Sequence, residues 1–337
     1  FASLGCSLQN DYTQEKTSLG LYFDGSYDLT KDTKLRFGAR STNDVIELSN
    51  FNAGYYGSDG TLVVPTIAQE LLPEDEIDEN EWSGKVSVDH ILSTGDLVYV
   101  SYNRGYRSGA FNGQSFNDPS EAAPVDPEIL DAFELGFKAD FLSRQLRING
   151  AAFYYDYEGQ QFINVDPNTA AQTLQNIDSS TIKGLEFDIT AALTDDLMLR
   201  AGFGYLDTEV DGGVISGVDV SGNQLTQSPE YNANIGLDYN QTLGDSGSIN
   251  WHVDGTWSDK YYFDIHNTEA IAQDAYAVVN ARVTWTSPDE GYEIAIWGKN
   301  LTDEEYLTKA FDLSGFGGVM AHYGQPVSYG AELTVNF

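Results

Sequence analysis

Residues 327–337 read Val-Ser-Tyr-Gly-Ala-Glu-Leu-Thr-Val-Asn-Phe, so apolar side chains alternate with small or polar ones throughout this stretch. Successive side chains of a β-strand point to opposite faces, so a period of two predicts a strand with one apolar side and one wet side. The apolar side would carry Val327, Tyr329, Ala331, Leu333, Val335 and Phe337.

The same alternation recurs upstream, at residues 34–40, 184–193, 231–240 and 249–258. The composition agrees with a β-protein, since the chain has 33 Gly, 21 Tyr, 17 Phe and 5 Trp against 2 Met. Hydrophobic residues make up 41% of the 337 residues, which is too many for a disordered acidic chain. Cys6 is the single cysteine, so the chain contains no disulfide framework.

The charge balance excludes one class of partner. Asp and Glu number 52 against 17 Lys and Arg, which gives a formal net charge of −35. Binding to nucleic acid requires a concentrated basic face, so we expect no nucleic-acid partner.

Connections between the alternating segments are short on one side and long on the other. The long polar ones lie at about residues 49–80, 109–127, 161–177, 210–228, 261–273 and 303–322. Outer-membrane barrels have this layout, with short periplasmic turns and long external loops. Aromatic clusters near the loop-side strand ends would form the interfacial girdle: Tyr99, Tyr102 and Tyr106; Tyr154, Tyr155 and Tyr157; Trp257, Tyr261, Tyr262 and Phe263.

Counting between turns predicts an all-β, antiparallel transmembrane barrel with about thirteen strands. They lie at about 13–28, 34–48, 81–93, 97–108, 128–142, 146–160, 178–193, 197–209, 229–243, 248–260, 274–287, 291–300 and 323–337. Bacterial single-chain barrels close with even numbers of strands. The odd count therefore indicates either a miscounted strand or part of a larger barrel.

Four motifs follow one another along the chain. They are Tyr-Asn-Arg-Gly-Tyr-Arg-Ser-Gly-Ala-Phe-Asn-Gly at 102–113, Pro127-Glu128 leading to Glu-Leu-Gly-Phe-Lys at 134–138, Asn176-Ile177 followed by Lys-Gly-Leu-Glu at 183–186, and Lys-Asn-Leu-Thr-Asp-Glu-Glu-Tyr at 299–306. In this order and spacing they resemble the C-terminal half of the TonB-dependent outer-membrane receptors. The resemblance covers about residues 11–337.

The resemblance implies a 22-stranded barrel closed by a plug, with residues 1–337 forming a partial barrel of the last thirteen strands. No plug, TonB-binding segment or early strands are recognised in the sequence, so coupling to the TonB complex is expected through that missing region. The resemblance further implies a bacterial outer-membrane location, contact with lipid and lipopolysaccharide, and energy-coupled import of a scarce ligand. A ferric siderophore is the default ligand, with corrinoid, haem and glycan left open.

The last strand is expected to have a second role. By resemblance, its alternating residues and aromatic end form the assembly signal that the outer-membrane insertion machinery reads. These residues are Tyr329, Ala331, Leu333, Val335 and Phe337. The alternative is an edge strand that merely closes the barrel.

Catalytic and metal-binding patterns were sought as a control. His90, His252, His266 and His322 have no neighbouring Glu or Cys at metal-ligand spacing, and no nucleophile elbow occurs. The acidic run between Glu70 and Glu81 lacks the glycine-spaced ligand order of a calcium loop and is interpreted as a solvated loop. We therefore predict no enzyme, no metal and no cofactor.

Six residues near the predicted external loops are candidates for ligand contact: Arg104, Tyr106, Arg107, His266, His322 and Tyr323. The two arginines present planar forks suited to a carboxylate or an anionic chelate. The alternative for them is pairing with interior carboxylates such as Glu134 or Glu186, or with a plug.

Two other functions remain open at this point. A passive porin-like channel would share the strand pattern without a plug, and a soluble or surface-anchored β-rich binding module would share the alternation without the membrane. If the apolar rows were buried between two stacked sheets, the barrel hypothesis would fail.

Overall fold

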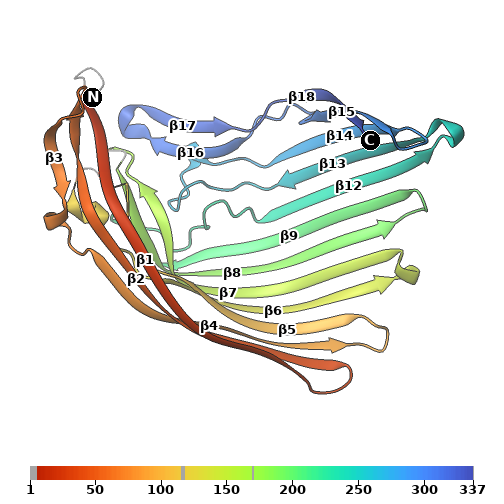
Figure 1. The fold of residues 1–337 in the computed structure, drawn as a ribbon, viewed down its shortest axis with the longest axis horizontal. Coiled ribbons are helices and arrows are strands. Elements are labelled where there is room, and N and C mark those ends of the chain that lie inside the picture. The colour runs from red at the N-terminus through yellow and green to blue at the C-terminus, as the bar shows by residue number, and fades with distance from the viewer. Residues whose placement is uncertain (1–5, 115–117, 169–170, 337) are drawn as a thin grey trace.

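The computed structural model describes residues 6–114, 118–168 and 171–336. Thirteen strands form one continuous antiparallel sheet in the order β1-β2-β4-β5-β6-β7-β8-β9-β12-β13-β14-β15-β18, and β3 pairs with β2 beside it. Figure 1 shows this sheet as a curved trough whose two edges, β1 and β18, are not joined to each other.

The strands of the main sheet are β1 (Cys6–Asp28), β2 (Thr33–Gly57), β3 (Leu62–Ala68), β4 (Glu76–Ile91), β5 (Leu97–Arg107), β6 (Glu128–Phe141), β7 (Leu146–Val165), β8 (Gln172–Ala192), β9 (Leu197–Gly212), β12 (Tyr231–Thr242), β13 (Ser248–Ser258), β14 (Tyr276–Thr286), β15 (Tyr292–Lys299) and β18 (Ser328–Val335). Each of the thirteen predicted strands corresponds to one strand of this sheet. The all-β antiparallel architecture is therefore confirmed, whereas the 22-strand total stays a prediction.

The connections contain further structure. Two small hairpins lie off the main sheet, β10 (Val214–Ile215) with β11 (Val218–Asp219), and β16 (Leu307–Leu313) with β17 (Gly318–Tyr323). Short 3-10 turns are η2 (Gln69–Leu71), η3 (Pro119–Ala122), η4 (Leu142–Arg144), η5 (Gly244–Ser246), η6 (Glu269–Ile271) and η7 (Ser314–Phe316). Among the described residues, no helix is long and apolar enough to cross a membrane.

Several predicted boundaries were wrong at the long-connection end. β2 continues to Gly57 and β4 begins at Glu76, so much of the segment 49–80 is strand. In the β2 extension the buried apolar side chains change from even positions, Ile46 and Leu48, to odd ones, Phe51 and Ala53. No single alternating pattern therefore runs through the extension, although the backbone ladder continues. In the same way, the segment 303–322 contains the β16–β17 hairpin.

Register places the apolar residues of neighbouring strands in common rows. Ile294 lies opposite Leu333, and Val253 lies opposite Leu237. We call this the apolar face of the sheet and the opposite one the polar face. The apolar rows are uncovered, since Leu333 is 65% exposed, Ile235 52% and Trp251 45%. A stacked-sheet sandwich would bury these side chains, so the structure is not a sandwich.

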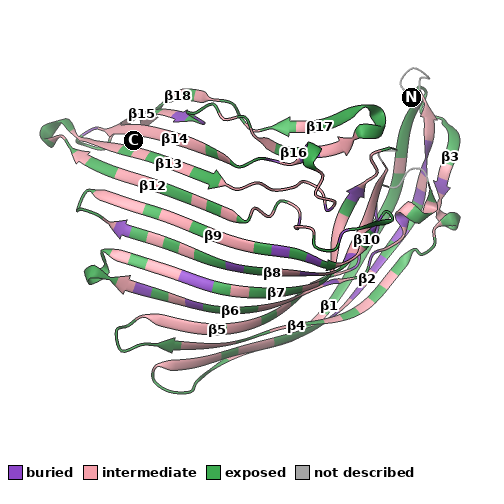
Figure 2. Ribbon diagram, turned by 180° about the vertical axis from the view of Figure 1, so that it is seen from behind, coloured by how far each residue is buried: buried purple, intermediate pink, exposed green. Residues whose placement is uncertain are grey.

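The largest buried side chains gather instead at the long-connection end, where Figure 2 shows buried stretches on β2, β8 and β9. One cluster comprises Ile46, Leu48, Phe51, Ala53, Ile67, Phe111 and Ala122. A second comprises Ile177, Val210, Ile215, Val220, Leu225 and Ile265. Each cluster joins residues from several connections, so the long-connection end of the molecule is folded around two small cores of its own.

A matched pair of substitutions on β13 tests the assignment of the two faces. Val253→Arg puts a charge on the apolar face, while Thr256→Arg puts the same charge on the polar face. In a lipid bilayer we expect Val253→Arg to reduce the free energy of unfolding by about 2–4 kcal/mol, because a charge on a lipid-facing position is costly. Urea unfolding of the protein in lipid vesicles measures both, and equal losses would contradict the assignment.

Candidate functional site

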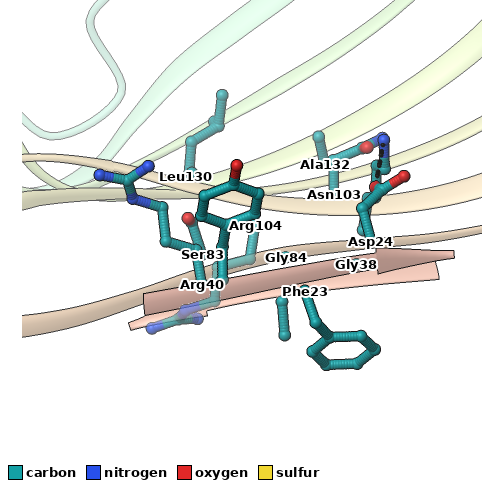
Figure 3. Close-up of a pocket in the computed structure, with 14 residues that line it drawn as sticks. Phe23, Asp24, Gly38, Arg40, Ser83, Gly84, Asn103, Arg104, Leu130 and Ala132 are labelled. Atoms are coloured by element: carbon teal, nitrogen blue, oxygen red, sulfur yellow. Dashed lines mark ion pairs between the residues drawn. The ribbon is translucent and has the colours of Figure 1, made fainter. Parts of the chain in front are cut away.

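The polar face is hollowed where four neighbouring strands carry small residues. Gly38, Ser83, Gly105 and Ala132, from β2, β4, β5 and β6, line a hollow of about 500 Å³. Figure 3 shows this hollow, with Asp24 beside it.

The rim of the hollow carries charged side chains. Lys85 Nζ lies 2.9 Å from Asp24 Oδ2 across the strands. Arg40 has no carboxylate partner among the described residues and donates from Nε to Thr42 Oγ1 at 2.9 Å. Its guanidinium is exposed and also borders an adjoining hollow of about 460 Å³. Arg40 is therefore a cation available to an anion on the polar face.

The two predicted arginines point to opposite faces, because they lie three positions apart on one strand and successive side chains alternate. Arg104 Nη1 pairs with Asp131 Oδ2 at 2.5 Å and its guanidinium lies 4.8 Å from the Trp82 ring, on the face that carries Tyr102. Arg107 Nε pairs with Glu128 Oε1 at 2.7 Å. Both arginines thus pair with carboxylates, but these are not the Glu134 and Glu186 considered from the sequence.

Glu134 has a different partner. Its Oε1 accepts a hydrogen bond from the Tyr99 hydroxyl at 2.6 Å. Glu128 is only 7% exposed and also accepts the Gln161 backbone N–H at 2.7 Å. The Arg107–Glu128 pair therefore joins β5, β6 and β7 at the long-connection end, where it holds the strands in register.

Tyr106 belongs to a third polar cluster. Its hydroxyl donates to Asp44 Oδ2 at 2.9 Å, and Lys16 Nζ lies 3.4 Å from the same oxygen. Lys16 also donates to Ser108 Oγ at 2.6 Å. The cluster ties the β5–β6 connection to β1 and β2, and sequence reasoning missed Lys16 and Asp44 because neither stands in a motif.

Glu79 completes this attachment. The backbone N–H of Gly109 donates to its Oε1 at 3.0 Å. Burial raises the pKa of Glu79, and the nearby negative charge of Asp44 adds to that effect, while the Gly109 hydrogen bond opposes it. This one carboxylate of the predicted acidic loop is therefore structural.

The remaining candidates lie elsewhere. His266 lies in the β13–β14 connection and lines a cavity with Phe311 of β16. His322 and Tyr323 lie on β17, where Tyr323 is 67% exposed and pairs with Leu307. The six predicted residues are thus distributed over separate places and do not form one cluster, and their role in ligand contact stays a prediction.

The sequence of the chain matches a known protein family. A family described as TonB dependent receptor-like, beta-barrel, matches residues 3–301. The chain belongs to the TonB-dependent receptor family. Proteins of this family lie in the outer membrane and act as receptors, which agrees with the uncovered apolar face.

Two curated relatives are similar over much of the chain. The probable TonB-dependent siderophore receptor PiuA of Acinetobacter baumannii is 27% identical over 257 residues, covering 71% of this chain and 31% of that protein. The ferric-pyoverdine 358 receptor of Pseudomonas putida is 22% identical and covers 97% of this chain and 36% of that protein. This receptor chain therefore spans about a third of the length of these relatives.

Solved structures show the same fold. The ferric yersiniabactin uptake receptor FyuA from Yersinia pestis gives a TM-score of 0.81 at 18% identity, covering 98% of this chain and 47% of that one. The structure of PiuA gives 0.71 at 21% identity, covering 96% of this chain and 43% of that one. At these identities the likeness concerns the fold alone.

The described residues of the receptor chain contain no group of three or more His, Cys, Asp or Glu side chains arranged to hold a metal ion. Phe337, the last residue of the predicted assembly signal, lies outside the described residues. The other four lie on or beside β18 at the sheet edge, where Tyr329 is 72% exposed.

The pKa of Glu79 makes the β5–β6 attachment sensitive to pH. A folded-state pKa above the ordinary value of 4.5 means that the contribution of Glu79 to stability is full below that value and is lost as pH rises through the folded pKa. We expect amide exchange of residues 108–113, corrected for its intrinsic pH dependence, to speed up with this rise in the wild type. Glu79→Gln should abolish this dependence, because the amide oxygen still accepts the Gly109 N–H without charge.

Glu76→Gln serves as the matched control, since Glu76 lies on the same strand, has no Gly109 contact and is not among the groups that shift the pKa of Glu79. It should retain the wild-type pH profile. An unchanged profile in Glu79→Gln would show that another group controls the attachment.

Proposed function

We propose that residues 1–337 form part of the barrel of a TonB-dependent receptor that imports a ferric siderophore through the bacterial outer membrane. The observation that carries the proposal is the family match over residues 3–301, together with siderophore receptors among the relatives. The fold supports it, since one face of the sheet is apolar and uncovered while the other is polar.

The open edges support a larger barrel. In lipid every backbone N–H and C=O needs a partner, so β1 and β18 must pair with further strands when the sheet is in a membrane. We propose that these thirteen strands are part of a 22-stranded barrel. The apolar face then meets lipid, the polar face lines the interior, and the six long connections from about 49–80 to 303–322 lie outside the cell.

The ligand would reach the polar face from the long-connection end. Arg40 is the exposed guanidinium on that face without a carboxylate partner in the described part of the chain. We add it to the predicted contacts for an anionic chelate. Arg107 borders the adjoining hollow, although it shares its charge with Glu128. His322 and Tyr323 would act from β17. Arg104 is poorly suited because it lies on the apolar face, and His266 because the carboxylates of Asp264 and Asp312 line the same cavity.

The remaining partners follow from the location. The apolar face would contact outer-membrane lipid, and the long connections would lie against lipopolysaccharide. The β18 edge with Tyr329, Ala331, Leu333 and Val335 would present the assembly signal to the insertion machinery. Energy from the TonB complex would act through a plug that is not among these strands, and we infer no catalytic activity for the chain.

Iron uptake tests the function. Cells that depend on this receptor should accumulate iron-55 from a ferric siderophore, and loss of either the receptor or TonB should abolish the accumulation. Uptake that persists without TonB would contradict energy-coupled transport. A steady conductance of the purified receptor in a planar bilayer would instead indicate a passive channel.

Arg40→Ala tests whether this guanidinium contributes to ligand binding. Since an unpaired guanidinium on the polar face would attract an anionic chelate, we expect weaker binding of the ferric siderophore by about three- to tenfold. Lys34→Ala, on the polar face of β2 and already paired with Asp28, is the control.

A further inference from the structure

A second cavity lies among the long connections, apart from the hollows of the polar face. It has a volume of about 330 Å³, within the range of small-molecule sites. We call it the loop chamber and define it by Phe162, Phe263, Asp264, His266, Phe311 and Asp312. Its walls come from β7, the β13–β14 connection and β16, which are far apart in the sequence.

The floor of the chamber is fixed by hydrogen bonds between connections. Asn223 Nδ2 donates to the Ile265 carbonyl at 2.8 Å, and the Gln227 N–H donates to the Tyr262 carbonyl at 2.8 Å. Ile265 is 3% exposed and Ile271 1%. A floor held in this way is formed before a ligand arrives, which lowers the entropic cost of binding.

The roof is the β16–β17 hairpin, which extends from the β15–β18 end of the sheet (Figure 1). Its tip is attached where the Gly315 N–H donates to the Pro167 carbonyl at 3.0 Å. A Cβ at Gly315 would lie 2.5 Å from Asn168 Cα, so only glycine allows this close approach. Near its base, the Leu307 N–H donates to Gln273 Oε1 at 2.5 Å.

The residues that line the chamber favour a positively charged ligand. Three phenylalanines, Phe162, Phe263 and Phe311, line the chamber together with Asp264 and Asp312, and no Lys or Arg is among the described residues that line it. Aromatic faces and carboxylates both attract cations. Lys309 already places Nζ 4.7 Å from the centre of the Phe311 ring, so this ring receives an ammonium group in the structure.

Both carboxylates are oriented by local hydrogen bonds. Asp264 Oδ1 accepts the Thr268 N–H at 2.9 Å, and Asp312 Oδ1 accepts the Ser314 N–H at 2.8 Å. An anionic ferric chelate would be repelled by these two charges. The chamber therefore suits a different ligand from the one proposed for import.

We propose that the loop chamber is a binding site for a small molecule that combines an aromatic ring with a cationic amine. The ring packs among the three phenylalanines and the ammonium faces Asp264 and Asp312. This site is separate from the hollows of the polar face, since it is built from the end of β7, the β13–β14 connection and β16.

Three probes with the same phenyl ring and a tail of similar length test the preference for positive charge: phenethylamine, 2-phenylethanol and phenylacetate. Their binding to the purified protein in lipid nanodiscs is measured by ligand-observed NMR. We expect phenethylamine to bind, 2-phenylethanol to bind more weakly and phenylacetate not to bind. The proposal would be overturned if phenylacetate bound as tightly as phenethylamine. It would also be overturned if none of the three probes bound.

Substitutions locate the binding. Asp312→Asn should weaken phenethylamine binding by about five- to tenfold, and Phe311→Ala by a similar factor. Lys309→Met should strengthen it, because it removes a competing ammonium group. Asp59→Asn, in the β2–β3 turn, is the matched control and should bind like the wild type.

The roof is tested separately. Gly315→Val should displace the hairpin tip and reduce phenethylamine binding, while the heat-modifiable band on a gel shows that the sheet itself remains folded. If Asp312→Asn and Phe311→Ala bind phenethylamine as the wild type does, the amine binds elsewhere and the chamber is not its site.

Discussion

The structure depends on the requirement that every strand in a membrane has a neighbour for its backbone. The interior strands from β2 to β15 meet this requirement through continuous antiparallel ladders on both sides. Lipid then replaces the second sheet that a soluble β-protein would need, which is why a whole face of apolar residues is left uncovered. The two edge strands, β1 and β18, each have one side without a neighbouring strand. On β1, Leu21 is 82% exposed and Phe23 59%.

The polar face is stabilised by ion pairs, because opposite charges lie close together there on neighbouring strands. Arg36 pairs with Asp89 at 2.6 Å, and Arg200 pairs with Asp238 at 2.6 Å. His252 has Asp238 at 2.8 Å from Nδ1 and Asp254 at 3.2 Å from Nε2. Most of the 17 Lys and Arg side chains pair with carboxylates in this way. Asp and Glu side chains number 52, so they outnumber these cations and account for the net negative charge of the chain.

The sequence could predict the sheet because alternation and turns are local properties. It could not predict the end of β2 at Gly57, since the buried apolar positions change from Ile46 and Leu48 to Phe51 and Ala53 and so break a single alternating pattern. The spacing of Arg104 and Arg107 already implied opposite faces. Their partners could not be predicted, because choosing Asp131 over Glu134 requires the register between β5 and β6. The loop chamber could not be predicted from the sequence. Its walls come from β7, the β13–β14 connection and β16, which are far apart in the sequence and share no motif.

The two small cores at the long-connection end determine what can move there. Phe111 and Ala122 attach the β5–β6 connection to β2, and Ile265 attaches the β13–β14 connection to β9. Segments held by buried apolar side chains open only at a cost comparable to local unfolding. The β16–β17 hairpin belongs to neither core, and its tip is held by the Gly315–Pro167 hydrogen bond. Among the described connections, the hairpin is therefore the element that a ligand could displace while the rest of the mouth keeps its shape.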